Sequence, residues 1–500
     1  FYYYKIKIYI TNLMKSNFSE VLILFQNGKL NEAKNICEEI LKQETNNSEA
    51  YNLYAFVLYS LKEFDVAIEY WNKATKINPN YFEAYNGRGN AFIKLQKFDE
   101  AIIDFNQAIK INPNYFEAYN NLGSALIKLE KFDEAIINFD QVIKIKSNYA
   151  QAYHGKAYAL MKSLKFDEAI INFNQALKIN PNYASAHNNM GSAFYGLGQW
   201  EEANNCYTKA LEINPNHKDA HENLINLLTF YNPKKNNSNS IIKTNYLLKS
   251  NKLNFDLKNK ITDEEIINYY YKTYQILKEN LYNDNFDEDQ IFRRNNVDLN
   301  CDRHFEVFNT YNVIPKFCFG CYKIQINPKN IIEFFKLYIV FDHLKLEKNN
   351  SRKCMIELRS STGGAYKGFI YCSGVNEAQK IFKDILPIIK TSIGDNLSIS
   401  IKRGCSEFSV PYPKFKEIDQ SMKYNDNWIE KEKQIDEKNK YKNTKNVLEK
   451  TISGISISDA LIMRNWLIYA KRINDESYKK FNINIPDTKY MEKQFFGQLD

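Results

Sequence analysis

Apolar and polar residues between positions 14 and 233 follow a helical pattern, and the whole pattern returns every 34 residues. The phrase KFDEAIINF occupies residues 131–139 and again 165–173, and KFDEAIIDF occupies 97–105. A turn of sequence NPN separates most copies, as at 112–114. Self-similarity with a fixed period is the signature of a repeat protein. We therefore expect one supersecondary unit to be built several times in succession.

Each copy predicts two amphipathic helices joined by a short turn. Apolar residues recur at spacings of three and four, which gives each helix one buried face. In one copy these positions are Tyr119, Leu122, Gly123 and Leu126 in the first helix and Ala135, Ile136, Phe139, Val142 and Ile143 in the second. Pro113 ends the preceding helix because proline cannot donate the next backbone hydrogen bond. One hairpin cannot bury both apolar faces, so the copies are expected to stack into an all-α solenoid.

The repeated motif resembles that of the tetratricopeptide repeat (TPR) family over residues 14–230. The positions that carry the resemblance are Tyr119, Leu122, Gly123, Leu126, Ala135, Phe139 and Val142, and their equivalents in the other copies. The sequence departs from the family pattern at Arg88, where Leu is usual, and at Ser147, where Pro is usual. The resemblance implies a superhelical solenoid of six repeats, followed by a capping helix within 217–233.

The resemblance also implies a concave face, lined by the first helix of each repeat, that binds an extended or helical peptide of a partner protein. The expected groove residues are Asn52, Asn86, Asn90, Asn120, Asn121, His154, Asn188, Asn189 and Asn223, with Glu83 and Glu117 beside them. An amide side chain donates and accepts, so a row of Asn can pair with a peptide backbone of any sequence. The acidic residues favour a basic or neutral segment. The alternative is that Asn only fills solvent-facing positions.

Composition and pattern divide the rest of the chain. Residues 1–13 are expected to be an upstream or fragment segment, because Met14 is the first Met. The expected parts are a solenoid at 14–233, a linker at 234–300 with a helix at 262–281, a Cys-rich α+β domain at 301–415, and a charged tail at 416–500 with an amphipathic helix at 458–473. For that last helix we expect docking on one of the domains.

The overall composition narrows the class of protein only slightly. The 67 basic and 59 acidic residues leave a net charge of +8, which permits a nucleic-acid partner without arguing for one. No apolar run is long enough to span a membrane. Eight cysteines in so long a chain without an evident leader favour a reducing, cytoplasmic location. Nothing in the sequence indicates an oligomeric state.

The α+β domain is predicted from alternating segments between 316 and 405. Strands are expected at 316–326, 352–359, 365–372 and 397–405, and helices at 327–346 and 375–393. The order β-α-β-β-α-β is typical of a small ferredoxin-like sandwich.

Five cysteines are expected to gather at one edge of that sheet. In the predicted topology the starts of the first two strands share an edge with the ends of the last two. The residues so placed are Cys318, Cys321, Cys354, Cys372 and Cys405. Gathered thiolates could bind zinc or an iron–sulfur cluster, and Cys318-x-x-Cys321 is the usual half of such a site. A redox pair and simple packing in the core are the alternatives.

A second alternative function of this domain places a binding surface on the opposite face of the predicted sheet. The segment YKGFIYC at 366–372 resembles a strand of RNA-recognition-motif domains, in which alternate aromatic residues stack on bases. The residues so implied are Phe319, Phe369 and Tyr371, with Lys367 beside them. RNA is therefore a possible partner of this domain.

The sequence shows no nucleophile–base set, no phosphate-binding loop and no dinucleotide fingerprint. We therefore favour a non-enzymatic adaptor, in which the solenoid binds a partner peptide. RNA binding by the second domain and a metal- or redox-dependent function at its cysteines stay open as alternatives.

Overall fold

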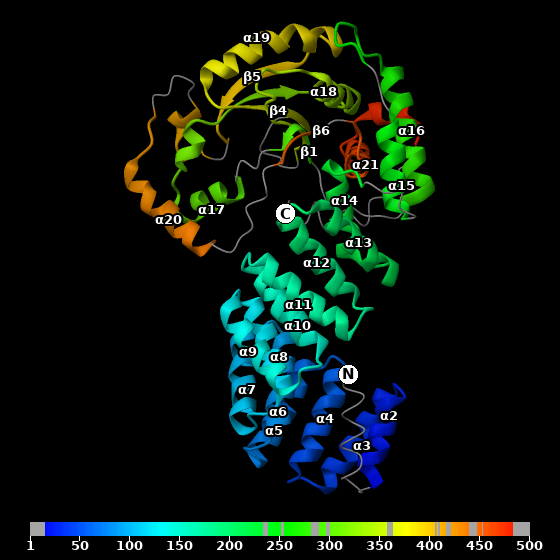
Figure 1. Cartoon of the computed structure of the whole chain (residues 1–500), viewed down its shortest axis with the longest axis vertical. Coiled ribbons are helices and arrows are strands. Elements are labelled where there is room, and N and C mark those ends of the chain that lie inside the picture. The colour runs from blue at the N-terminus through cyan, green and yellow to red at the C-terminus, as the bar shows by residue number, and fades with distance from the viewer. Residues whose placement is uncertain are drawn as a thin grey trace. The chain divides into compact units, whose positions relative to one another are not determined.

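The structure is a computed structural model and describes residues 16–233, 239–251, 255–281, 290–296, 301–357, 364–405, 408, 411–416, 422–439, 448–452 and 454–483. The chain forms two compact units, one up to Ala193 and one from Phe194 (Figure 1). The expected upstream segment 1–13 lies outside the described residues.

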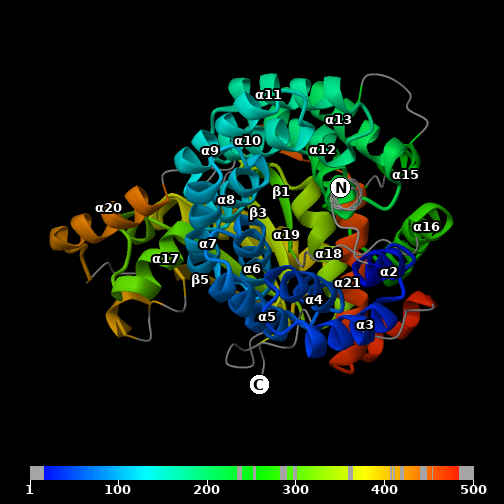
Figure 2. The ribbon, with the colours of Figure 1, turned by 90° about the horizontal axis from the view of Figure 1, so that it is seen from below.

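The first unit is a stack of helix pairs, as the repeat pattern predicts. Its helices are α2 (Ser16–Gln26), α3 (Leu30–Gln43), α4 (Ser48–Ser60), α5 (Phe64–Ile77), α6 (Phe82–Lys94), α7 (Phe98–Ile111), α8 (Phe116–Lys128), α9 (Phe132–Ile145), α10 (Ala150–Lys162) and α11 (Phe166–Ile179). The helix α12 (Ala184–Gly196) continues the series into the second unit. The even-numbered first helices lie on the inner side of the curve, and α5, α7, α9 and α11 lie on its outer side (Figure 2).

Small residues let neighbouring helices approach closely around one aromatic ring. Ala135 and the ring of Phe139 in α9 are fully buried. A Cβ atom placed on Gly123 of α8 would come within 2.8 Å of that ring, and one on Gly155 of α10 within 2.5 Å. Phe139 thus fills the space between the first helices of two successive repeats. The recurring small and aromatic positions of the motif therefore set the packing distance between repeats.

The turn inside each hairpin places one residue, at the same repeat position, in the left-handed region of backbone conformation. The residues with positive φ at this position are Gly28, Lys62, Gln96, Glu130, Leu164 and Gly198. After α8, the Lys131 N–H donates to Leu126 O and the Glu130 N–H donates to Ile127 O, which is the Schellman arrangement that ends helices. The helix end is therefore fixed by backbone bonds even where Gly is replaced by a larger residue.

The second unit is built on one six-stranded antiparallel sheet. Its strands are β1 (Gln290–Asn296), β2 (Tyr322–Asn327), β3 (Arg352–Ile356), β4 (Tyr366–Cys372), β5 (Ser398–Arg403) and β6 (Leu448–Ile452), in the order β5-β2-β4-β3-β1-β6. The helix α18 (Ile331–His343) joins β2 to β3, and α19 (Val375–Ser392) joins β4 to β5. The expected β-α-β-β-α-β segment is thus present, with β1 and β6 as two further strands that the sequence pattern does not predict.

The expected first strand starts later than predicted. Residues Lys316–Phe319 form a short 3-10 helix, η1, and β2 begins only at Tyr322. The Cys318 N–H donates to Pro315 O and the Gly320 N–H donates to Phe317 O, so the chain turns before it extends. This difference changes which side chains lie on the sheet, with consequences for the predicted sites.

The helices α18 and α19 cover one face of the sheet. Ile324, Ile326 and Ile370 lie under them and are fully buried. At Gly368 a Cβ atom would collide with the side chain of Leu337 in α18, so the glycine lets this helix lie close to β4. The opposite face of the sheet carries the alternate residues of each strand.

The helix α21 (Ile457–Arg472) is a buried element rather than the amphipathic helix predicted at 458–473. It packs on α14 (Lys218–Phe230), α15 (Ser240–Ser250), α16 (Asp263–Leu281) and α18. Its Trp466 is fully buried, with its ring 4.4 Å from that of Phe334. Its cap is Ser456, in a capping box with Asp459. The hydroxyl of Ser458 lies 2.7 Å from that of Thr229 in α14.

The segment expected to be a linker contributes to this core. At the start of its helix α16, Thr262 and Glu265 form a capping box, in which the Glu265 N–H donates to Thr262 Oγ1 and the Thr262 N–H donates to Glu265 Oε2. Tyr270 and Leu277 of α16 and Leu248 of α15 are buried with the sheet and α21 in one apolar cluster. Residues 240–281 therefore belong to the second unit wherever the structure describes them, whereas 234–238 lie outside the described residues.

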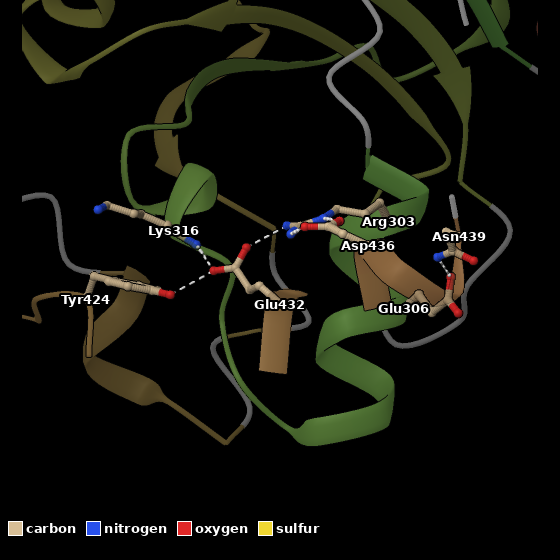
Figure 3. A network of polar contacts seen from close by, with 7 residues as sticks. All are labelled: Arg303, Glu306, Lys316, Tyr424, Glu432, Asp436 and Asn439. Atoms are coloured by element: carbon tan, nitrogen blue, oxygen red, sulfur yellow. Dashed lines mark hydrogen bonds and ion pairs between the residues drawn. The ribbon is translucent and has the colours of Figure 1, made fainter. Parts of the chain in front are cut away.

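Part of the charged tail is held by ion pairs. In α20 (Ile429–Lys438), Glu432 and Asp436 both bind Arg303 of α17 (Cys301–Tyr311) (Figure 3). The Lys316 N–H and the Tyr424 hydroxyl also donate to Glu432. Burial opposes the ionisation of Glu432, but these hydrogen bonds outweigh it and hold its pKa below the ordinary value. The network thus joins α20 to α17.

Candidate functional sites

The predicted groove residues at one repeat position form hydrogen bonds to the next repeat. The Asn52 amide donates to the hydroxyl of Tyr81 at 3.1 Å, and the Asn86 amide donates to that of Tyr115 at 3.2 Å. In each pair the two residues are 29 positions apart. His154 takes the same place two repeats later, with its Nδ1 atom 3.3 Å from the hydroxyl of Tyr183. We call the series Asn52, Asn86, Asn120, His154 and Asn188 the ladder, in which Asn52, Asn86 and His154 make this contact.

A second set of contacts strengthens the ladder. The Asn121 amide donates to Asn86 Oδ1 at 2.9 Å, and Asn189 Nδ2 lies 3.0 Å from His154 Nε2. These partners are 35 positions apart, so each also joins one repeat to the following one. At Asn86 and at His154, the ladder residue is thereby bound to two side chains of the next repeat.

The expected exposure of the ladder is therefore wrong for several members. Asn52, Asn86 and Asn188 are buried, with exposed fractions of 9%, 3% and 3%. Their amides satisfy polar groups inside the stack, because a buried polar group without a partner is costly. The other expected groove residues are half-buried: Asn90, Asn120, Asn121, His154, Asn189, Asn223, Glu83 and Glu117. Of these, Asn223 lies on α14 in the second unit, and the others lie in the first.

Arg88 stands where the family pattern has Leu, and its guanidinium has a charged partner. Its Nε atom donates to Asp104 at 2.7 Å, and its Nη1 atom donates to Asn72. The later repeats carry Asn138 and Asn172 where this one has Asp104. A carboxylate in that single copy balances the guanidinium, so the substitution of Leu is compensated within the same repeat.

His154 is the titratable member of the ladder. Its ring lies 4.8 Å from that of Tyr183 and 5.8 Å from that of Phe173. Burial lowers its pKa from 6.5 to about 4, although a hydrogen bond with the backbone of Ser185 acts in the opposite direction. The imidazole is therefore neutral in the folded repeats at pH 7.

The second candidate site is the sheet face opposite α18 and α19. The strand register places Lys323 of β2 between Tyr371 of β4 and Lys402 of β5, and it places Lys353 of β3 beside Phe369. The rings of Phe369 and Tyr371 are 6.5 Å apart. The Lys323 Nζ atom lies 5.2 Å from the centre of the Phe369 ring, and that of Lys353 lies 6.0 Å from it. Both lysines thus form cation–π contacts with this ring.

Positive charge predominates on this face. Lys367 forms an ion pair with Glu357 at 2.8 Å, and both side chains are buried. Burial lowers the pKa of Lys402, and the positive charges of Lys367 and Lys323 lower it further. Lys323, Lys353, Lys367 and Lys402 therefore lie on this face, and Lys367 is paired with Glu357.

Phe319 does not belong to this surface, so its predicted place there is wrong. It lies in η1, and its ring packs 5.2 Å from Phe415 and 5.7 Å from Tyr424. Because β2 begins at Tyr322, the residue beside Tyr371 on the neighbouring strand is Lys323. Among the side chains that the structure describes, the adjacent rings on this face are those of Phe369 and Tyr371.

The five expected cysteines do not form one cluster. Cys354 is the third residue of β3 and lies opposite Gly368, about 13 Å along β4 from Cys372. Both are buried on the face under α18 and α19. Cys318 packs with Phe408 and Phe415 in a separate apolar cluster. These three cysteines therefore occupy core positions in two different places.

Cys318, Cys321 and Cys405 lie at the end of the sheet, with Cys301 of α17 close enough to contribute to the raised pKa values of Cys318 and Cys321. Burial raises the pKa of Cys318, and it raises that of Cys321 to about 11. Within the described part of the chain, no three His, Cys, Asp or Glu side chains are arranged to hold a metal ion. The predicted zinc or iron–sulfur site is not confirmed, and none of the eight cysteines, all of them described, forms a disulfide.

Comparison with family profiles recognises the repeats. A profile described as TPR repeat matches residues 55–96, 89–130 and 165–198. A second profile, described as Tetratricopeptide repeat, matches residues 116–149 and 184–217. No curated protein matches the sequence. Among the described helices, none is both long and apolar enough to cross a membrane.

Several solved structures are similar to part of the chain. YrrB, described as a TPR protein with an unusual peptide-binding site, is 24% identical over 37% of this chain and 95% of its own, with a TM-score of 0.33. A thermophilic TPR protein of Thermus thermophilus is 20% identical over 36% of this chain and 99% of its own, with a TM-score of 0.32. The pilF protein of Pseudomonas aeruginosa is 17% identical over 41% and 94%, with a TM-score of 0.38.

The position of His154 leads to a test by pH. In the unfolded chain the imidazole takes up a proton near pH 6.5, whereas the folded repeats resist protonation until about pH 4. Stability from the neutral ring is thus present above pH 6.5 and is lost as the pH falls toward 4. We expect His154→Asn, which restores the residue found elsewhere in the ladder, to lose less stability between pH 7 and pH 4.5 in urea unfolding. An equal loss in both proteins would contradict this assignment.

The matched segments carry the 34-residue period and the helix pairs described above. Such repeats support a role in protein–protein interaction as a scaffold. Residues 55–149 and 165–217 of this chain are tetratricopeptide repeats.

Proposed function

We propose that the scaffold binds a peptide segment of a partner protein along the inner side of the first unit. The observation that carries the proposal is the ladder, whose hydrogen bonds hold successive first helices in a fixed relation. A preorganised surface loses little entropy when it binds an extended ligand. The half-buried amide of Asn120 on α8 would pair with the peptide backbone.

The charge of the first helices favours a basic or neutral peptide. Glu49, Glu83 and Glu117 recur in the first turn of α4, α6 and α8. A row of carboxylates attracts basic side chains and disfavours acidic ones. The proposed ligand is therefore a segment with Lys or Arg rather than one with a cluster of acidic residues.

This proposal is tested by selecting binders from a peptide library and measuring their affinity by fluorescence anisotropy. We expect basic peptides to be enriched and Glu83→Lys to weaken their binding at least ten-fold. Glu69→Lys is the matched control, because Glu69 is exposed on α5 at the outer side. Enrichment of acidic peptides, or equal effects of the two substitutions, would overturn the proposal.

A second candidate function is the binding of single-stranded RNA on the sheet face opposite α18 and α19, where Tyr371 is half-buried and Phe369 is 9% exposed. It is favoured by the adjacent rings of Phe369 and Tyr371 and by the excess of lysines around them. Aromatic rings stack on bases, and lysines neutralise phosphates. The lysines over Phe369 are flexible enough to move from the ring to the backbone of a bound strand.

RNA binding is tested with a labelled single-stranded oligonucleotide and the full chain. We expect Phe369→Ala/Tyr371→Ala to weaken binding at least ten-fold, because each stacked base contributes about 1–3 kcal/mol. The control is Tyr246→Ala, which removes an exposed ring on α15. Urea unfolding of both variants distinguishes a lost contact from a lost fold. Absence of binding by the unmodified protein would exclude this function.

A further inference from the structure

Three of the eight cysteines are not fully buried, and these three lie near one another. All eight are described, and the half-buried ones are Cys301, Cys321 and Cys405. They come from the start of α17, from the residue before β2 and from the chain just after β5. Burial raises the pKa of the Tyr371 hydroxyl, and the charges of these three thiols raise it further. The three thiols therefore converge at one end of the sheet, beside Tyr371.

The backbone holds Cys321 and Cys405 at neighbouring positions. The strands β2 and β5 are antiparallel, with Tyr322 opposite Arg403. One step beyond this pair, the Gly404 N–H donates to Cys321 O at 2.7 Å, so the two chains stay together past the end of β5. Cys405 directly follows Gly404. A residue one step from a paired position has its Cα atom about 6 Å away, which is a separation that a disulfide bond spans.

A turn at Gly404 directs the Cys405 side chain towards Lys323. Gly404 has a φ of +55°, in the left-handed region, so the chain leaves the extended conformation at this residue. The Cys405 Sγ atom lies 3.7 Å from the Lys323 Nζ atom. Cys321 precedes Lys323 by two positions, and the charge of the same lysine acts on its thiol. Both thiols are therefore close to one ammonium group.

The surroundings give the two thiols different reactivity. The Lys323 ammonium stabilises the negative charge that sulfur carries when a thiol reacts as a nucleophile. Cys405 is the thiol in contact with it and is half-buried, so a small oxidant can reach it. Burial raises the pKa of Cys321 to about 11, although Lys323 acts in the opposite direction. Cys405 is thus suited to react first, and Cys321 to react with the oxidised Cys405.

Cys318, the other member of the Cys-x-x-Cys motif, is less suited to this reaction. It is 5% exposed and packs with Phe408 and Phe415 in an apolar cluster that Cys405 only borders. Moving its thiol towards either neighbour would remove it from that packing. The structure therefore favours a pair of cysteines that the spacing in the sequence does not indicate.

We propose that Cys321 and Cys405 form a reversible disulfide bond when the protein is exposed to a peroxide. The bond joins the start of β2 to the chain after β5, at the end of the sheet face that carries Lys323 and Tyr371. This oxidation site is independent of the peptide and RNA binding proposed above. Dithiothreitol or another dithiol restores the two thiols by exchange.

The reaction takes place in two steps and needs only hydrogen peroxide. The Cys405 thiolate attacks one peroxide oxygen, an S–O bond forms as the O–O bond breaks, and the departing hydroxide takes up a proton to become water. The Cys321 sulfur then attacks the sulfur of the resulting sulfenic acid, the S–O bond breaks, and a second water leaves. The two cysteines lose two electrons in total, and the peroxide gains them.

The bond also affects the stability of the second unit. The loop that it closes contains β2, α18, β3, β4, α19 and β5. Closing a long loop restricts the unfolded chain more than the folded one. We therefore expect the peroxide-treated protein to unfold at a higher urea concentration than the reduced protein, and dithiothreitol to reverse the change.

The pairing is tested by mass spectrometry of the full chain after peroxide treatment, alkylation of the remaining thiols and digestion with trypsin. We expect peptide 317–323 to be linked to peptide 404–414, and the link to disappear with dithiothreitol. Peptide 317–323 contains both Cys318 and Cys321, so variants must distinguish them. Cys321→Ser is expected to reduce the linked product at least ten-fold, whereas Cys318→Ala retains it.

Cys301→Ser is the matched control, because it removes the third half-buried thiol of the group and is expected to leave the link unchanged. Urea unfolding of each reduced variant distinguishes a lost bond from a lost fold. Three results would overturn the proposal. They are the absence of the linked peptides, a link that persists in Cys321→Ser but not in Cys318→Ala, and a bound metal ion that protects these thiols from alkylation.

Discussion

The hydrogen bond between one repeat and the next is the interaction on which the rest of the first unit depends. Asn52 and Asn86 donate to Tyr81 and Tyr115, and His154 contacts Tyr183 in the same way. Apolar packing brings the repeats together but has little directional preference. A buried amide that must find a hydroxyl 29 positions later fixes how far each repeat is rotated against its neighbour. This fixed relation is what makes a regular surface possible on both sides of the stack.

The second unit uses buried polar groups in a similar way around a different core. The helix α21 is surrounded by α14, α15, α16 and α18, and polar groups at its start have internal partners. Ser456 and Asp459 form its capping box, and the Ile457 N–H donates to Asn245. Each such contact satisfies a group that would otherwise be buried without a partner. The last helix of the repeat series, α14, is thus part of the α+β core as well.

Much of the first unit could be predicted from the sequence, because the same pattern recurs every 34 residues in each copy. The helix pairs and the small residues beside Phe139 follow directly from the pattern. The same pattern favours an open groove at the ladder positions, although the recurring Tyr81, Tyr115, Tyr149 and Tyr183 are visible in it as candidate partners. A period locates equivalent residues, but it does not say which of them face each other across the stack.

The second unit was less predictable, because its sites depend on where single strands begin. The 3-10 turn at Lys316–Phe319 moves Phe319 off the sheet and brings Lys323 beside Tyr371. The register of β3 separates Cys354 from the expected edge. A shift of a few residues is weakly encoded by local pattern, yet it decides which side chains meet. The partners of Arg303 on α20 are 129 and 133 positions away and leave no local signal.

The most direct test of this account is a double-mutant cycle on one rung of the ladder. Asn86→Ala, Tyr115→Phe and the double variant are compared with the unmodified chain by urea unfolding. The account predicts a coupling free energy of about 1 kcal/mol between the two residues, as expected for a buried hydrogen bond. A coupling indistinguishable from zero would show that the repeats are held in register by apolar packing alone, and would contradict the central claim.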